Sequence, residues 1–189
     1  MTKKELRGIY HKKRLELTET EKLKYNDLLL IRFQQLSFEN LQLIMSYSPM
    51  YEKGEMDTHL FTRYLSHLIP DLQVCYPVME FNSNMLTPVL IDDETVFTEN
   101  AYGIAEPVNG LKIPPEQIDM VLVPLLAFDK KGYRVGYGKG FYDRFLKQCR
   151  SDITSVGFSY FEAVDRIDDT NQFDVPLNYC ITPQKVYEF

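Results

Sequence analysis

The sequence predicts a three-layer α/β/α protein, in which helices cover both faces of a mainly parallel sheet, in a single domain spanning residues 1–189. Three observations predict this fold. Apolar segments of strand length alternate with segments of helix length, as is typical of parallel sheets. Residues 118–126, IDMVLVPLL, form a continuous apolar run, which indicates a strand buried on both faces. The chain has 189 residues, 44% of them hydrophobic, and is long enough to bury one sizeable core.

Two helices are expected at the start of the chain, over about residues 3–17 and 19–36. Each follows a capping box, TKKE from Thr2 and TETE from Thr18. In such a box a threonine and a glutamate three residues later satisfy free backbone N–H groups at the start of a helix. The second segment offers four apolar residues for a buried face: Leu23, Leu30, Phe33 and Leu36.

The rest of the chain alternates between strands and helices. A third helix is expected over residues 57–69, where Pro70 stops it, and a fourth over residues 141–149. The expected strands are residues 41–47, 72–78, 86–91, 118–126, 153–158 and 178–182. The Pro/Gly-rich segment 107–117 is expected to be a loop and not a domain boundary.

Composition narrows the classes of function. The formal net charge of −6 does not favour nucleic acid as a partner. No apolar run is long enough to span a bilayer, and the charged N-terminal segment does not resemble a signal peptide. The three cysteines are isolated and unequally spaced, so they suggest neither a disulfide framework nor a zinc site: Cys75, Cys149 and Cys180. We therefore expect a cytoplasmic protein with reduced thiols.

The segment 128–145, FDKKGYRVGYGKGFYDRF, carries the strongest functional signal. It lies between the most apolar strand and the fourth helix, at the end of the sheet where ligands of α/β proteins bind. Its glycines allow the backbone to approach a phosphate closely, and Arg134 and Lys139 add positive charge. The pattern indicates an anion-binding loop. The alternative is a tight exposed turn with solvated lysines.

The loop matches neither of the two common phosphate-binding motifs. In a Walker A motif a glycine would stand where Tyr133 stands, and Ser or Thr would follow Lys139. A dinucleotide fingerprint would need a third glycine at Phe141. The residues alone therefore predict an anion and leave its identity open.

Two acids flank the loop. Asp143 falls in the first turn of the fourth helix, where it could hold Mg²⁺ beside a phosphate or simply complement the helix dipole. Asp129 stands at the loop entrance, where a turn-forming role before Gly132 is favoured over a ligand role.

The stretch AFDKKGYRVGYGKGFYDRFL resembles the signature of the 5-formyltetrahydrofolate cyclo-ligase family. Four shorter segments fit the same family in the same order, so the resemblance covers nearly the whole chain: Lys3–Arg7 (KKELR), Glu55–Thr58 (EMDT), Gly103–Pro107 (GIAEP), and Asp174–Asn178 (DVPLN) followed by Thr182. One departure is Leu125, where the family usually has glycine. We expect it to alter packing at the strand end and to leave the activity in place.

The resemblance implies an ATP-dependent ring closure that converts 5-formyltetrahydrofolate to 5,10-methenyltetrahydrofolate and releases ADP and phosphate. ATP would be the co-substrate and Mg²⁺ the metal. ATP would phosphorylate the formyl oxygen, which is otherwise a poor leaving group, and N10 of the folate would then attack the activated carbon. Phosphoryl transfer mainly requires positioning and charge stabilisation, which suits a chain with three histidines and no evident catalytic triad.

The resemblance also assigns site residues. The catalytic residues would be Lys139 and Arg134. Metal ligands would be Asp143 and Asp174. The nucleotide would be bound by Lys3, Lys4, Arg7, Arg134, Gly136, Tyr137, Gly138, Lys139, Gly140, Phe141 and Tyr142. The folate would be bound by Met50, Glu55, Tyr137, Gly138, Lys139, Gly140 and Phe141, with Glu55 accepting hydrogen bonds from the pterin edge.

Each assignment has a structural alternative. The basic first helix could present a solvated charged face, Glu55 could be an acid at the start of the third helix, and Asp174 could be a turn acid. The aromatic residues of the loop could serve packing alone.

Two other classes of function stay open at this point. One is a folate- or nucleotide-binding module without activity, and the other is a sugar-phosphate isomerase on a related scaffold. The expected partners are small molecules, a reduced folate and ATP, without nucleic acid or membrane. The expected assembly is a monomer or a weak homodimer.

Overall fold

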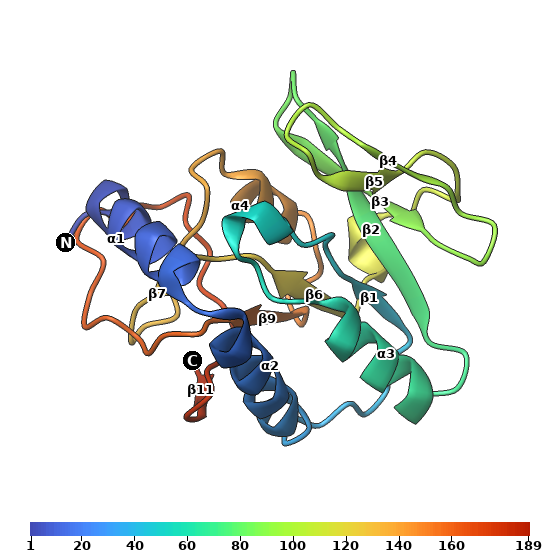
Figure 1. Cartoon of the computed structure of the whole chain (residues 1–189). Helices are drawn as coiled ribbons and strands as arrows, with labels where there is room; N and C mark the ends of the chain where they lie inside the picture. Colours follow the sequence, from blue (N-terminus) through green and yellow to red (C-terminus); the bar gives the residue numbers. More distant parts are fainter.

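A seven-stranded sheet forms the centre of the computed structural model, which describes residues 1–189 (Figure 1). Its strand order is β11-β10-β9-β6-β1-β2-β3. The bounds are Leu43–Met45 for β1, Gln73–Glu80 for β2, Met85–Leu90 for β3, Met120–Val123 for β6, Thr154–Phe158 for β9, Tyr179–Ile181 for β10 and Val186–Glu188 for β11. The five inner strands are parallel, and the two edge strands are antiparallel to their neighbours. The predicted mainly parallel sheet is confirmed.

Helices lie on both faces of this sheet, as predicted. Their bounds are Lys3–Glu16 for α1, Glu19–Phe33 for α2, His59–Leu68 for α3 and Phe141–Leu146 for α4. Both predicted capping boxes form, so α1 and α2 begin where the sequence indicates. The expected helices 19–36, 57–69 and 141–149 are shorter in the structure. None of the helices is both long enough and apolar enough to span a membrane.

The two faces of β6 show how the layers are held together. Met120 and Leu122 belong to an apolar cluster with α2 and α3, whereas Val121 and Val123 belong to one with α4. Such alternation is expected because successive side chains of a strand point to opposite faces. All four residues are buried, which explains the continuous apolar run.

The expected strand 118–126 ends earlier than predicted, at Val123. The chain turns at Pro124, and Ala127–Phe128 forms β7, which pairs with Arg134–Val135, β8, in a small antiparallel sheet. This hairpin carries the glycine segment back across the carboxyl edge of the main sheet. Asp129 shapes its turn, since its carboxylate accepts hydrogen bonds from the backbone N–H groups of Lys131 and Tyr133 at 2.9 and 3.1 Å. The turn-forming interpretation of Asp129 is confirmed.

Several short strands do not follow from the sequence pattern. They are β4 (Phe97–Glu99), β5 (Ala105–Pro107), β7, β8 and β11, each of two or three residues. A run this short shows no period, and β4 is exposed along its whole length. The segment 107–117 is mostly a loop as expected, although Pro107 ends β5, Lys112 forms an isolated bridge with Val89, and Pro115–Gln117 forms a 3-10 turn. A second such turn follows β1 at Tyr51–Lys53.

The chain reverses its direction of winding between β1 and β6. From β1 it moves outward to β2 and β3, and it later returns to place β6 on the other side of β1, followed by β9 and β10. Crossover connections leave in opposite directions here, so the loops after β1 and β6 separate and open a crevice at the carboxyl ends of the strands.

Leu125 packs at this strand end against a glycine. Leu125 is 3% exposed, and a Cβ atom built on Gly157 in β9 would lie 2.5 Å from Leu125 Cδ2 and 2.7 Å from Leu177 Cδ1. Gly157 therefore provides the space that the leucine occupies. The departure from the family pattern is accommodated by packing within the core.

We predict that Gly157→Ala lowers the free energy of unfolding by about 1–3 kcal/mol, because the added methyl group overpacks this contact. Urea denaturation measures the loss. The matched control is Gly8→Ala in exposed α1, where a Cβ atom would meet nothing within 4 Å and where alanine should add about 0.5–1 kcal/mol. A Leu125→Ala, Gly157→Ala double variant should lose less stability than the sum of the single variants; strict additivity would contradict the contact.

Candidate active site

The crevice at the β1/β6 reversal is a cleft of about 470 Å³. Tyr47 and Ser48 follow β1 into it, Pro124 follows β6, and Pro77 and Met79 of β2 form one wall. All the site residues predicted from the sequence line this cleft except Lys4, which is exposed on α1. Segments far apart in the chain thus meet at a single site.

The glycine loop forms a rim of the cleft beside α1. Gly138 and Gly140 have φ angles of +90° and +71°, a region that favours glycine. Arg7 lies against the loop: its Nε donates to the carbonyl of Gly136 at 2.8 Å, and a Cβ atom on Gly138 would be 3.0 Å from its Nη2. The first helix therefore presents Lys3 and Arg7 to the site. Of the α1 residues assigned to the nucleotide, Lys4 alone is exposed outside the cleft.

Lys139 is the exposed cation of the loop. Its side chain makes no hydrogen bond or ion pair within the chain, although its carbonyl accepts a hydrogen bond from Arg144 Nη1 at 2.8 Å. The ammonium group is therefore available to a ligand. The cleft is lined by five cationic side chains and three carboxylates, a formal excess of two positive charges in a chain of net charge −6. This local excess favours an anionic ligand.

Arg134 is positioned differently from Lys139. Its side chain is 5% exposed, and its two Nη groups donate to the carbonyl of Val175 at 2.6 Å and to Asp143 Oδ1 at 2.9 Å. The backbone N–H of Val175 also donates to Asp143 Oδ1, at 3.1 Å. Arg134 thus fixes Asp143 and the segment after Asp174, and its Nη groups are already occupied by protein partners.

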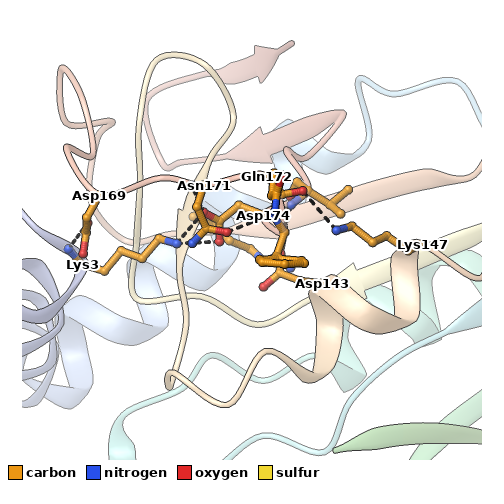
Figure 2. Close-up of polar contacts among 10 residues, drawn as sticks. Lys3, Asp143, Lys147, Asp169, Asn171, Gln172 and Asp174 are labelled. Carbon is orange, nitrogen blue, oxygen red and sulfur yellow. Dashed lines mark hydrogen bonds and ion pairs between the residues drawn. The ribbon is translucent and has the colours of Figure 1, made fainter.

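The two predicted metal ligands differ in availability. Both oxygens of Asp174 contact Lys3 Nζ, at 2.5 and 2.6 Å, and Oδ2 also accepts from the N–H of Asn171 at 2.7 Å (Figure 2). Asp143 lines the cleft, and its Oδ2 makes no hydrogen bond within the chain. No cluster of three or more metal-ligating side chains is present. The arrangement fits Mg²⁺ held by one carboxylate together with phosphate oxygens and water, a common mode for this ion.

Glu55 lines the cleft with 5% exposure, whereas Lys139 is exposed, so we call the part of the cleft at Glu55 its closed end and the part at Lys139 its open end. One of its oxygens accepts from the backbone N–H of Met50 at 2.8 Å, and the other accepts a short hydrogen bond from the Tyr137 hydroxyl. Burial raises the pKa of Glu55, and these hydrogen bonds act in the opposite direction. Glu55 makes no bond to the start of α3. Asp57 does so by accepting from the N–H of His59 at 3.0 Å, so the helix-start interpretation of Glu55 is wrong.

Several residues at the cleft do not follow from the sequence. Lys53 places its Nζ 4.9 Å from the centre of the Tyr137 ring, and Tyr102 and Ile104 reach the cleft from the β4–β5 hairpin. Arg14 lies directly beneath Tyr137, with its Nη2 2.6 Å from the hydroxyl. A signal for Arg14 existed, because it continues the buried helical stripe of Leu6 and Tyr10, where an arginine is unusual.

A positively charged cleft at the reversal point of a parallel sheet is typical of the class of α/β proteins that bind anionic small molecules. The sequence model described as the 5-formyltetrahydrofolate cyclo-ligase family matches residues 1–183. The chain belongs to this family of enzymes, and the resemblance inferred from the glycine segment is confirmed.

Curated relatives and solved structures agree with this membership. A 5-formyltetrahydrofolate cyclo-ligase of Haemophilus influenzae is 32% identical over 149 residues, covering 76% of this chain and 75% of the relative. The cyclo-ligase of Escherichia coli K12 is 30% identical over 141 residues, covering 72% and 76%. The structure of Aquifex aeolicus 5,10-methenyltetrahydrofolate synthetase superimposes with a TM-score of 0.82 at 32% identity, covering 100% of this chain and 93% of that one. A 5,10-methenyltetrahydrofolate synthetase of Mycoplasma pneumoniae gives 0.74 at 26% identity, covering 96% and 98%.

Proposed function

We propose that this protein converts 5-formyltetrahydrofolate to 5,10-methenyltetrahydrofolate at the expense of ATP, with release of ADP and phosphate. The observation that carries the proposal is that Lys139 of the glycine loop and the buried Glu55 line the same cleft. One end of the cleft suits a phosphate chain, and the other suits the hydrogen-bond donors of a pterin ring. Family membership supports the same reaction.

The reaction proceeds in two steps in this proposal. The formyl oxygen attacks the γ-phosphorus of ATP, an oxygen–phosphorus bond forms, and the bond to the β-phosphate oxygen breaks to release ADP. N10 of the same folate then attacks the formyl carbon, which has become a strong electrophile. The carbon–oxygen bond breaks, phosphate leaves with the former formyl oxygen, and the N10 proton is lost to solvent or phosphate. The protein's contribution is positioning and charge stabilisation.

Cations at the open end of the cleft hold the nucleotide. Lys139 is the free cation nearest in sequence to the loop glycines, and it contacts the transferring phosphoryl group. Arg7 adds charge beside Gly138, where it is already fixed by the carbonyl of Gly136. Arg134 serves as a positioning residue for Asp143, because its Nη groups are bound to protein atoms.

Glu55 binds the pterin at the closed end. A carboxylate can accept four hydrogen bonds, and Met50 and Tyr137 supply two. The remaining capacity suits the 2-amino group and the adjacent N–H of a pterin. Met50 borders the same end of the cleft and contributes apolar surface.

Mg²⁺ would be held by Asp143 and would neutralise charge on the phosphate chain. Asp174 could join it only if Lys3 moves away, since Lys3 contacts both of its oxygens. Lys3 released in this way would become a further cation for the nucleotide. The two aspartates are therefore expected to differ in their effect on metal dependence.

Replacement of Lys139 tests the phosphoryl-transfer end. Lys139→Ala should lower kcat about 30- to 1000-fold, equivalent to about 2–4 kcal/mol, because a contact made mainly in the transition state is lost. Folate binding measured by calorimetry should be retained. Lys147→Ala is the matched control, because Lys147 lies outside the cleft and contacts the carbonyl of Gln172. A kcat/KM close to that of the unaltered enzyme would contradict the role of Lys139.

Asp143→Asn should raise the Mg²⁺ concentration for half-maximal activity by about tenfold or more, the size expected for a weakened metal site. Asp174→Asn should raise it less, because Asp174 is bound to Lys3 before ligands arrive. Magnesium titrations of both variants at saturating substrates give the comparison. An unchanged titration for Asp143→Asn with a lower melting temperature would assign this residue to fold stability alone.

The complete reaction is tested by product analysis with labelled substrate. Methenyl product, followed by its absorbance, should appear with one ADP and one phosphate and without AMP or pyrophosphate. A substrate with ¹⁸O in its formyl group should give ¹⁸O-labelled phosphate, because that oxygen leaves on phosphorus. A binding module would give no turnover, and an isomerase would give no ADP. Unlabelled phosphate together with methenyl product would rule out the phosphorylated intermediate.

A further inference from the structure

Arg14 is a buried arginine directly behind the cleft wall. It lies on α1 with 3% exposure and does not line the cleft itself. Burial of a guanidinium group is costly unless its N–H groups are satisfied and its charge is balanced. The contacts that satisfy Arg14 therefore indicate why the fold keeps it.

Each nitrogen of the guanidinium group donates to a different segment of the site. Nε donates to the carbonyl of Lys53 at 2.9 Å, Nη1 to the carbonyl of Leu125 at 3.2 Å, and Nη2 to the hydroxyl of Tyr137 at 2.6 Å. These three residues belong to the turn after β1, the segment after β6 and the glycine loop. Gly54, with φ +67°, allows the turn to approach, since a Cβ atom there would be 3.3 Å from Arg14 Cγ.

The hydrogen bonds through Tyr137 have a fixed direction. A guanidinium group can only donate, so the Tyr137 hydroxyl oxygen accepts from Arg14 and its single proton is left for another partner. That partner is Glu55, which accepts the proton in a short hydrogen bond. Arg14 thus determines the direction in which the Tyr137 hydroxyl points.

Charge leads to the same pair. Arg14 Nη2 lies 4.0 Å from Glu55 Oε1, and no other cationic group forms an ion pair with this carboxylate. Four other titratable groups interact electrostatically with Glu55: Lys53 in the turn after β1, Tyr47 after β1, Tyr137 in the loop and Tyr142 in α4. Of these four, only Lys53 carries a positive charge, so Arg14 and Lys53 are the two cations that act on Glu55.

We propose that Arg14 is a positioning residue for folate recognition: it orients the Tyr137 hydroxyl toward Glu55 and supplies the charge that keeps Glu55 an acceptor for the pterin. The part of this inference that concerns the pterin rests on the proposed function. The part that concerns Glu55 is a property of the ligand-free protein and can be tested by itself.

The ligand-free test follows the carboxyl carbon of Glu55 by ¹³C NMR as pH is varied, with the signal assigned by its loss in Glu55→Gln. Burial already raises the pKa of Glu55, and removal of the adjacent cation in Arg14→Met should raise it further by about one unit or more. Arg14→Lys, which keeps the charge, should show a smaller rise. A midpoint that is the same in Arg14→Met and the unaltered protein would overturn the proposal, whatever the substrate is.

Arg150→Met is the control for a general loss of stability. Arg150 binds Asp119 at 2.6 Å, and Asp119 accepts from the N–H groups of Gln42 and Leu43 at the amino edge of the sheet, away from the cleft. Its loss should lower the melting temperature without moving the Glu55 midpoint. If Arg14→Met fails to fold, Arg14→Lys and Tyr137→Phe serve instead, since Tyr137→Phe removes the connecting hydroxyl and should also raise the midpoint.

The kinetic test separates folate binding from chemistry. Arg14→Met should raise the KM for 5-formyltetrahydrofolate about tenfold at neutral pH while the KM for MgATP stays within twofold, because Arg14 contacts neither Lys139 nor Arg7, the cations proposed to bind the nucleotide. The acid limb of kcat/KM should move to higher pH, since a carboxylate with a raised pKa is protonated at a higher pH. Equal loss for both substrates without a pH shift would assign Arg14 to structure alone. If the Glu55 midpoint shifts in Arg14→Met as expected but the unaltered protein shows no turnover, the proposed function is refuted and the effect of Arg14 on Glu55 stands.

Discussion

The site depends on one constraint, the end of β6 at Pro124. β6 is buried on both faces, so the N–H and C=O groups of its backbone must form hydrogen bonds with β1 and β9. Its apolar side chains pack against helices on either side of the sheet. Pro124 cannot continue the ladder, and the chain leaves the sheet beside the end of β1. The β7–β8 hairpin then carries the glycine loop back over the opening. A cleft is thereby placed where the connections of the sheet diverge.

Most charged groups at this opening are paired before any ligand arrives. Arg134 binds Asp143, Lys3 binds Asp174, and Arg14 is held among backbone carbonyls, Tyr137 and Glu55. Such pairing reduces the cost of burying charge and limits the motion of each side chain. Among the cationic side chains that line the cleft, only that of Lys139 makes no hydrogen bond or ion pair within the chain. An ammonium group without a protein partner agrees with the proposal that Lys139 contacts the phosphoryl group during the reaction.

The fold and much of the site could be predicted from the sequence because their signals are local. Capping boxes fixed the starts of α1 and α2, and the apolar run indicated β6. The glycine segment indicated the loop that borders the cleft. The β4–β5 hairpin could not be predicted, because three-residue strands carry no period. Arg14 was missed because its role depends on three carbonyl and hydroxyl groups that only tertiary structure brings together. The resemblance of the segment Lys3–Arg7 assigned Lys4 to the nucleotide, but Lys4 is exposed outside the cleft, because a matching segment does not give the direction of each helical side chain.

The contrast between the charge of the whole chain and that of the cleft affects how ligands arrive. The chain carries a formal charge of −6, whereas the cleft has an excess of two positive charges. At physiological ionic strength the Debye length is about 8 Å, so an approaching anion is largely screened from the acidic surface until it is near the opening. It then experiences attraction from the cleft alone. At lower salt the repulsive field of the acidic surface should extend further than the attractive field of the cleft. The association rate with anionic ligands should therefore not rise at low salt as it does for uniformly basic proteins.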